Sequence, residues 1–229
     1  MRYSKFVIVL AFILGFSSCS PTNAAKRILP RESFLKIKKY LDVTLCHPQK
    51  KDLCVIKRFG ASASGVIVDS NGDHAYALTA AHVCTESNAK KMLGNHKFTM
   101  QFFVVNIHKR YFPVEIVAID TKNDLCILYI KGLYNPPIFD GFFDGNSGAR
   151  AIYSLPAKGG SSGSPIVNHR GELIGMVSAV YTYFPQITIS PKFKETTAFI
   201  KREVNNDKQK RNVNAIISFF GDLFSKKEK

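Results

Sequence analysis

The sequence predicts an all-β protein, either a sandwich or a barrel. From Ser64 onward most apolar residues fall in short, β-branched runs, and turn-forming residues separate one run from the next. One turn, Asp69 to Asp73 (DSNGD), has Asn-Gly at its centre, which is a strong hairpin signal. Helical spacing is limited to a stretch before these runs and to the C-terminal part. Short strands, frequent turns and few helices are typical of all-β folds.

The first residues have the layout of a secretory signal. A basic start (MRYSK) precedes an apolar run from Phe6 to Phe16 and a stretch of small residues. The run is shorter than the roughly 20 residues of a membrane span. We expect residues 1–25 to be removed on export, which places the protein in the periplasm or outside the cell. Cys19 leaves a second outcome open, because a small-residue stretch ending in Cys resembles a lipobox and would carry a lipid at that residue.

Residues 26–60 are expected to form an N-terminal lead-in, and residues 61–204 the main domain. In the lead-in, the apolar residues of Ser33–Leu45 have helical spacing and predict a short helix. The predicted strands of the main domain follow in order: SGVIVD, AYALTAAHV, KFTMQFFVVNI, FPVEIVAI, DLCILYI, PIFDGFF, RAIYSL, SPIVN, LIGMVSAVYTY and QITIS.

Helical character returns after Pro191, and residues 205–229 are interpreted as a basic linker followed by an amphipathic helix. The apolar stripe of that helix consists of Val213, Ile216, Ile217, Phe220, Leu223 and Phe224. The stripe fits either of two partners. It packs on its own domain, or it lies on a membrane with the basic tail (KKEK) against the headgroups.

The charge, the histidines and the cysteines limit the partners, metal sites and disulfides that the sequence can have. The net charge of +15 fits a generally basic solvated surface, or contact with an anionic membrane or cell-envelope surface. No nucleic-acid module accompanies it. The histidines outside the motifs described below lack partners at metal-ligand spacing, so we predict no metal site. The four cysteines after the leader allow three pairings. Cys46 and Cys54 flank a short loop that they would close, whereas Cys84 and Cys126 are either paired or free buried thiols.

Three local motifs occur in a fixed order. The first is Leu78–His82 (LTAAH), where a strand ends in a histidine, and the second is Asn123–Ile127 (NDLCI), where an acidic residue precedes an apolar strand. The third is a tight glycine loop, Gly159–Pro165 (GGSSGSP). A serine hydroxyl becomes a nucleophile when an imidazole removes its proton, and a buried carboxylate orients that imidazole. The motifs therefore predict a catalytic triad.

His82, Asp124 and Ser162 are the predicted triad. The backbone N–H groups of Gly160 and Ser162 are the predicted oxyanion hole, because glycines let the loop turn sharply enough for them to converge. Asp120 is an alternative carboxylate on the same segment as Asp124. Ser161 and Ser164 are alternative nucleophiles, although the Gly-x-Ser-Gly pattern selects Ser162.

Together these motifs resemble the chymotrypsin-like serine proteases, and are nearer to the bacterial and phage branch with its HtrA-type and glutamyl endopeptidases. The resemblance extends from about Ala63 to Phe199. It implies a double β-barrel over residues 61–204, no cofactor, and catalytic roles for the three triad residues. It also implies that Leu155–Lys158 and Ser178–Val180 line the specificity pocket. Neither stretch contains an acidic residue, which argues against cleavage after Lys or Arg.

The sequence departs from this family between Asp124 and Ser162. The stretch is short for the fold, and the second barrel is expected to lack one strand, which would leave an open edge. The function expected from the sequence is that of an exported serine endopeptidase, which hydrolyses a protein or peptide substrate through an acyl-enzyme. The alternative is a catalytically impaired binding module at a cell envelope or membrane surface.

Overall fold

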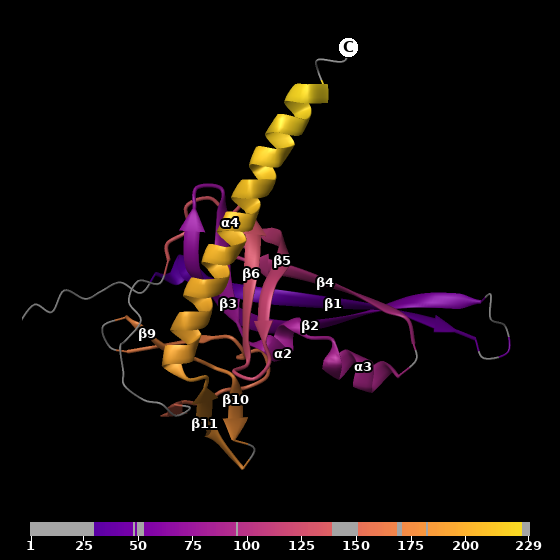
Figure 1. Cartoon of the computed structure of the whole chain (residues 1–229). Helices are drawn as coiled ribbons and strands as arrows, with labels where there is room; N and C mark the ends of the chain where they lie inside the picture. Colours follow the sequence, from indigo (N-terminus) through magenta and orange to yellow (C-terminus); the bar gives the residue numbers. More distant parts are fainter. Residues whose placement is uncertain are drawn as a thin grey trace, which may run out of the picture.

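The structure is a computed structural model that describes residues 30–47, 49, 53–94, 96–138, 151–168, 171–181 and 183–225. It consists of a closed β-barrel, a second lobe of short strands, and a long C-terminal helix (Figure 1). The predicted leader, including Cys19, lies outside the described residues.

Six strands close the first barrel. They are β1 (Phe34–Cys46), β2 (Cys54–Asn71), β3 (His74–Thr79), β4 (Phe98–Val105), β5 (Tyr111–Asp120) and β6 (Leu125–Lys131). The neighbour order is β1-β2-β3-β6-β5-β4, and β1 closes the ring by pairing antiparallel with both β2 and β4. Figure 1 shows β1 and β2 continuing beyond the barrel as a two-stranded ribbon. The predicted Asn-Gly hairpin joins β2 to β3, with Gly72 at a φ of 62°.

The barrel strands supply most of the core of the molecule. Their fully buried side chains include Ile37, Val66, Leu78, Ile127 and Leu128, and the adjacent Ile127 and Leu128 lie on opposite faces of β6. The same apolar cluster extends to residues of the second lobe and of the C-terminal helix, namely Leu173, Met176, Phe199, Ile200 and Val204. One continuous core therefore holds the barrel, the lobe and the start of the helix together.

The second lobe contains five short strands among the described residues. They are β7 (Ala151–Ser154), β8 (Pro165–Val167), β9 (Leu173–Met176), β10 (Ala179–Tyr181) and β11 (Phe184–Ser190). The order β10-β11-β7 forms one sheet, and β8-β9 forms another. Side chains connect the two sheets, because Tyr153 Oη donates to Ile174 O and Ser190 Oγ accepts from Met176 N. In the part of the chain that the structure describes, this lobe does not close into a barrel; most of the predicted strand PIFDGFF lies outside that part.

Within the described residues, four helical segments accompany the strands: η1 (Arg31–Ser33), α2 (Ala81–Cys84), α3 (Ser87–Leu93) and α4 (Phe193–Ser225). None of the described helices combines the length and the apolar character that crossing a bilayer requires.

The helix predicted over Ser33–Leu45 is wrong, because this segment is strand β1. Leu35, Ile37, Leu41 and Val43 are its buried residues, and they alternate with more exposed positions, as in a strand with one face against a core. Period-two spacing therefore decided the outcome in a segment that also fits a helix. As a consequence, the first barrel begins in the expected lead-in, and the predicted boundary at residue 61 falls inside β2.

The expected linker before the C-terminal helix is itself helical, and α4 runs through it without a break. Its polar residues bind the outside of the barrel. Tyr76 Oη donates to Asp207 at 2.9 Å, and Lys208 Nζ lies 2.8 Å from both carboxylate oxygens of Asp69. Arg211 lies with its guanidinium 3.5 Å from the ring centroid of Tyr129. These contacts stabilise the helix in a stretch whose composition alone suggested a linker.

Candidate active site

The first barrel brings His82 and Asp124 together. His82 lies in α2, a single turn directly after β3, and Asp124 directly precedes β6. His82 Nδ1 lies 3.0 Å from Asp124 Oδ2 and 3.1 Å from Oδ1, and the backbone N–H of His82 donates to Oδ1 at 3.0 Å. The aspartate side chain is 18% exposed and the imidazole 40%, so the carboxylate is the inner partner and the imidazole faces the surface.

Asp120, the alternative carboxylate, has a structural role instead. Its carboxylate accepts hydrogen bonds from the backbone N–H groups of Lys122 and Asn123 and from Asn123 Nδ2, at 2.7 to 3.1 Å. These bonds shape the turn that places Asp124 at a φ of 56°, a left-handed conformation uncommon for residues other than glycine. The structure therefore brings Asp124, and not Asp120, to the imidazole.

Ser178 is a further partner of Asp124. Its hydroxyl donates to Asp124 Oδ2, on the carboxylate that also faces His82. Burial by itself would raise the pKa of Asp124, but the hydrogen bonds from His82 and Ser178 outweigh burial and leave that pKa below its ordinary value of 3.8. The carboxylate thus stays ionised and acceptor-only, which favours a proton on His82 Nδ1 and leaves Nε2 as the basic nitrogen.

A disulfide joins the two elements that carry this pair. Cys84 is two residues beyond His82, Cys126 is two residues beyond Asp124, and the two cysteines are bonded to each other. Both are buried in the main core. The free-thiol alternative is therefore not what the structure contains. The second disulfide, Cys46–Cys54, closes the far end of the β1–β2 ribbon, as the sequence suggested.

The glycine loop presents Ser162 with two unused backbone donors. Gly160 and Gly163 have φ values of 94° and 83°, which explains why glycine stands at both positions. The N–H groups of the neighbouring residues Ser161 and Gly163 donate to Lys158 O and Val177 O. Within the described residues, those of Gly160 and Ser162 donate to no protein acceptor. Free N–H groups flanking a nucleophile are what an oxyanion hole requires.

Ser64 and Thr79 attach this loop to the first barrel. The N–H of Ser64 donates to Ser162 O at 2.8 Å, and Ser64 Oγ donates to Gly160 O at 3.0 Å. Thr79, which ends β3 three residues before His82, donates its hydroxyl to Ser64 O at 2.8 Å. A side chain on Gly163 would collide with Ser64 O and Thr79 Oγ1. The loop therefore rests on the strand end that leads into the histidine.

The hydroxyl of Ser162 itself makes no hydrogen bond with the described residues, so the Ser162–His82 bond of a working triad is not formed in this conformation. Catalytic hydrogen bonds commonly tighten only in the substrate complex. Of the alternative nucleophiles, Ser161 is engaged within the loop, because its Oγ accepts from Lys158 N.

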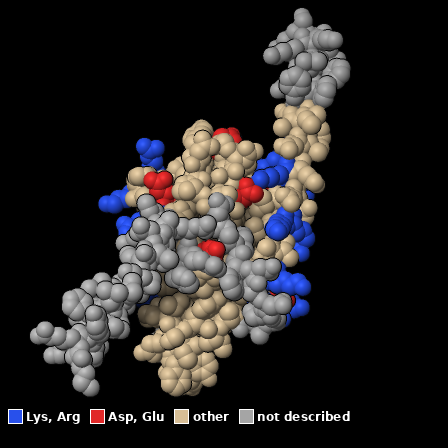
Figure 2. Space-filling view, turned by 90° about the vertical axis from the view of Figure 1, so that its left-hand side faces the viewer, with Lys and Arg blue, Asp and Glu red and all other residues tan. Residues whose placement is uncertain are grey.

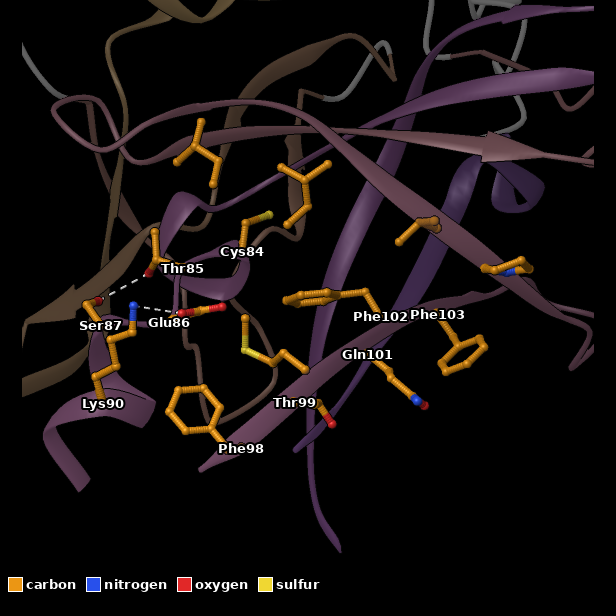
Figure 3. A pocket seen from close by; sticks show the side chains of 15 residues that line it. Cys84, Thr85, Glu86, Ser87, Lys90, Phe98, Thr99, Gln101, Phe102 and Phe103 are labelled. Atoms are coloured by element: carbon orange, nitrogen blue, oxygen red, sulfur yellow. Dashed lines mark hydrogen bonds and ion pairs between the residues drawn. The ribbon is translucent and has the colours of Figure 1, made fainter. Parts of the chain in front are cut away.

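Two hollows lie near these residues. One, of 520 Å³, borders the glycine loop. It is lined by Lys158–Ser161 and, from the barrel, by Ser62–Ser64 and Phe34–Lys36. A larger groove of 1100 Å³ lies between α3 and β4 and contains no triad residue. Figure 3 shows this second groove, with the Glu86–Lys90 ion pair toward one end and the ring of Phe98 beside it. No triad residue lines the smaller hollow either, but it is the one that borders the glycine loop, through Gly160, Ser161 and Ser164.

Among the described residues, no group of three or more His, Cys, Asp or Glu side chains is placed to hold a metal ion.

Sequence reasoning missed two kinds of residue. Ser178 was expected only as a pocket-lining residue, and the docking roles of Ser64 and Thr79 were not foreseen. Ser178 follows directly on the apolar segment of β9, where a lone polar residue offers a weak signal. The other two depend on contacts between strands remote in sequence.

Comparison with known proteins bears on the fold. No family model matches the sequence, and no curated protein matches it either. Among solved structures, the HtrA-type protease AlgW with a decapeptide is similar, with a TM-score of 0.54 and 18% identity over 76% of this chain and 65% of that chain. For a serine-to-alanine variant of AlgW with a decapeptide, the TM-score is 0.53 and the identity 18%, over 76% of this chain and 64% of that chain. For the serine endoprotease from Yersinia pestis, the TM-score is 0.49 and the identity 16%, over 77% of this chain and 64% of that chain.

The chain therefore spans 65% of the length of the AlgW chain that it matches. At this identity the likeness concerns the fold. The predicted resemblance to trypsin-like proteases is confirmed at that level, and so is the predicted fold class of a mostly β protein with a trypsin-like barrel.

Proposed function

We propose that this protein is a serine endopeptidase in which Ser162 is the nucleophile, His82 the general base and Asp124 the orienting carboxylate. The observation that carries the proposal is the convergence of two separate units. The first barrel holds the His82–Asp124 pair, and the nucleophile loop is hydrogen-bonded through Ser64 to the same end of that barrel. The trypsin-like protease fold, shared with AlgW, supports the proposal.

The residues would divide the chemistry as follows. His82 Nε2 takes the proton of Ser162 Oγ as the oxygen attacks the peptide carbonyl carbon, and Asp124 stabilises the resulting imidazolium. The N–H groups of Gly160 and Ser162 stabilise the oxyanion. The imidazolium returns its proton to the leaving amine, which departs and leaves an acyl-enzyme on Ser162. A water, deprotonated by the same imidazole, then attacks the acyl carbon. The imidazolium returns that proton to Ser162 Oγ as the ester bond breaks, which releases the acid product and restores the serine.

A peptide is the proposed substrate. The similar AlgW structures are of a protease with a decapeptide, and the 520 Å³ hollow beside Lys158–Ser161 offers space next to the nucleophile. The stretches Leu155–Lys158 and Ser178–Val180 contain no acidic residue, so we propose cleavage after residues other than Lys and Arg. We also propose that the protein acts outside the cytoplasm, which the predicted leader and the two disulfides support.

Labelling with a fluorophosphonate tests the proposal. The reagent modifies an activated serine, so wild type is expected to gain one adduct, mapped to residue 162 by mass spectrometry of peptides. Ser162→Ala should gain none. Ser161→Ala, one position away, is the matched control and should react at close to the wild-type rate.

A wild-type protein that is folded by circular dichroism and yet does not react would overturn the proposal. It would leave the alternative of a binding module on a protease fold. That alternative predicts peptide or polymer binding that is unchanged in Ser162→Ala.

A further inference from the structure

Helix α4 consists of two parts that differ in how they are held. The first part, up to Arg211, is attached to the barrel: its side chains Phe199, Ile200 and Val204 are buried, and Lys208 and Arg211 form ion pairs with Asp69 and Glu115. Among the described residues, no hydrogen bond or ion pair joins the helix to the barrel beyond Arg211. Figure 1 shows the second part of α4 projecting past the body of the molecule.

The projecting part carries large apolar side chains in the open. Val213 is 54% exposed, Ile216 56% and Ile217 64%. Figure 2 shows Lys and Arg along the attached part of the helix and an uncharged stretch above them. A helical segment this short is marginal in water by itself, so an exposed apolar stripe on it indicates a missing partner.

The sequence of residues 213–225 separates into two faces when placed on the helix. Val213, Ile216, Ile217, Phe219, Phe220, Leu223 and Phe224 are its large apolar residues. At 3.6 residues per turn they fall within an arc of roughly 160°. Asn214, Ser218, Asp222 and Ser225 fall on the other side. Such a separation is typical of a helix with one face on an apolar partner. The described part of the chain leaves more than half of Val213, Ile216 and Ile217 exposed, so it does not supply that partner.

Basic residues stand at both ends of this segment. Lys208, Lys210 and Arg211 precede it and Lys226, Lys227 and Lys229 follow it, whereas Asp222 is its sole charged residue. Lys208 and Arg211 are already paired with carboxylates, but Lys210 is exposed. Apolar residues between two basic clusters complement a surface that is apolar beneath a negatively charged layer, which describes an anionic lipid bilayer.

We propose that residues 213–225 of α4 form an amphipathic anchor that lies in the interface of an anionic lipid membrane. The helix lies along the surface and does not span it, because the apolar stretch is far shorter than the roughly 20 residues that a span requires. A second copy of the chain is disfavoured as occupant, because coiled-coil pairing needs apolar spacing sustained over about three heptads or more. The proposal does not depend on the protease function.

A single tryptophan tests the proposal, because the chain contains none. Ile216→Trp places the reporter on the apolar face, and Ser218→Trp places it on the opposite face two residues away. Each full-length variant is mixed with vesicles of phosphatidylcholine and phosphatidylglycerol in equal parts. Ile216→Trp emission is expected to shift to the blue and to be quenched by brominated acyl chains, whereas Ser218→Trp should respond weakly. Both variants carry the same leader, so vesicle binding through the leader affects them equally.

Vesicles of phosphatidylcholine alone should give a much smaller response with Ile216→Trp, since the basic clusters then have no anionic partner. An equal response in neutral vesicles would overturn the anionic preference. Unchanged Ile216→Trp emission with anionic vesicles would overturn the anchor itself. So would emission that is already blue-shifted without lipid, because the face would then be covered by the protein's own domain or, if sedimentation shows a dimer, by a second copy.

Discussion

The two parts of the candidate site are built in different ways. The His82–Asp124 pair belongs to a closed six-stranded barrel, and the disulfide Cys84–Cys126 links the two elements that carry it. Ser162 belongs to a lobe whose five described strands form two separate sheets. Among the described residues, Ser178 of the lobe donates to Asp124, and Ser64 of the barrel binds the glycine loop.

The comparison teaches where the site is robust and where it is sensitive. Closure removes free edges, so the barrel fixes the half of the site that holds His82 and Asp124 by its own stability. The other half depends on how the glycine loop docks. A displacement of about 1 Å there costs on the order of a hundredfold in rate. Variants on either side of this divide should therefore fail in different ways.

The largest effect is expected from Asp124→Asn. An amide at this position favours the wrong tautomer of His82 and no longer stabilises the imidazolium, so kcat/KM for a peptide substrate should fall by about ten thousandfold. Asp120→Asn is the matched control, because an amide oxygen still accepts from the turn N–H groups. It should retain activity within a few-fold. Similar losses in both variants would show that the turn, and not the carboxylate at 124, matters.

Removing the barrel disulfide is expected to cost the most stability. Loop-closure entropy predicts a loss of about 4 kcal/mol in the free energy of unfolding for the Cys84→Ser, Cys126→Ser double variant, whose cysteines are 42 residues apart. The Cys46→Ser, Cys54→Ser pair, at a separation of 8, should lose about 2.5 kcal/mol. Urea denaturation, extrapolated to zero urea with each variant's own slope, measures both losses.

Fluorophosphonate labelling should separate the two double variants further. The rate should drop in the first pair, where the clamp on His82 and Asp124 is lost, and stay close to wild type in the second. Equal labelling rates in the two pairs would contradict a positioning role for Cys84–Cys126.

Gly163→Ala tests the docking of the lobe. The new methyl group meets Ser64 O and Thr79 Oγ1, and a positive φ disfavours alanine, so the loop must move. We expect the labelling rate of Ser162 to fall by about a hundredfold. Gly159→Ala is the control, because nothing lies within 4 Å of its added methyl group. If Gly163→Ala reacts as fast as Gly159→Ala, the glycine loop does not position the nucleophile.

The smallest effect is expected from Ser178→Ala. Losing one hydrogen bond to the carboxylate should lower kcat/KM by about tenfold and raise the pKa of Asp124. In wild type, the stability from the lowered pKa is fully present above the ordinary value of 3.8 and is lost as the pH falls through the folded-state value. In Ser178→Ala this stability should be smaller, and its loss should be complete at a higher pH, because the folded-state pKa lies closer to 3.8. Superimposable acid-denaturation curves would show that Ser178 does not influence Asp124.

Local sequence patterns anticipated the parts of the fold that depend on local chemistry. The positive φ values in the glycine loop and the Asn-Gly hairpin fall at glycines, because few other residues adopt that conformation. The strand of Ser33–Leu45 was misjudged, because its apolar positions fit both periods and only its pairing with β2 and β4 decides between them. The helical linker at the start of 205–229 was misjudged for a similar reason, since its helix is held by ion pairs to the barrel.

The candidate site divides in the same way. The residues His82, Asp124 and Ser162 stand in short motifs whose chemistry is readable from their neighbours. The contacts of Ser64 with the glycine loop span 96 positions or more, and the contact of Ser178 with Asp124 spans 54. Composition and spacing say nothing about such contacts. The prediction that the second barrel lacks one strand also involves residues 139–150, which lie outside the described residues, so it stays a prediction.

The central claim is that the lobe and the barrel together form one working triad. A crystal structure of the chain after reaction with a fluorophosphonate tests it most directly. We expect a phosphonyl group on Ser162 Oγ, with its oxygen facing the N–H groups of Gly160 and Ser162. We also expect His82 Nε2 to form a hydrogen bond with the adduct. An unmodified Ser162, or an adduct on another residue while His82 remains paired with Asp124, would contradict it.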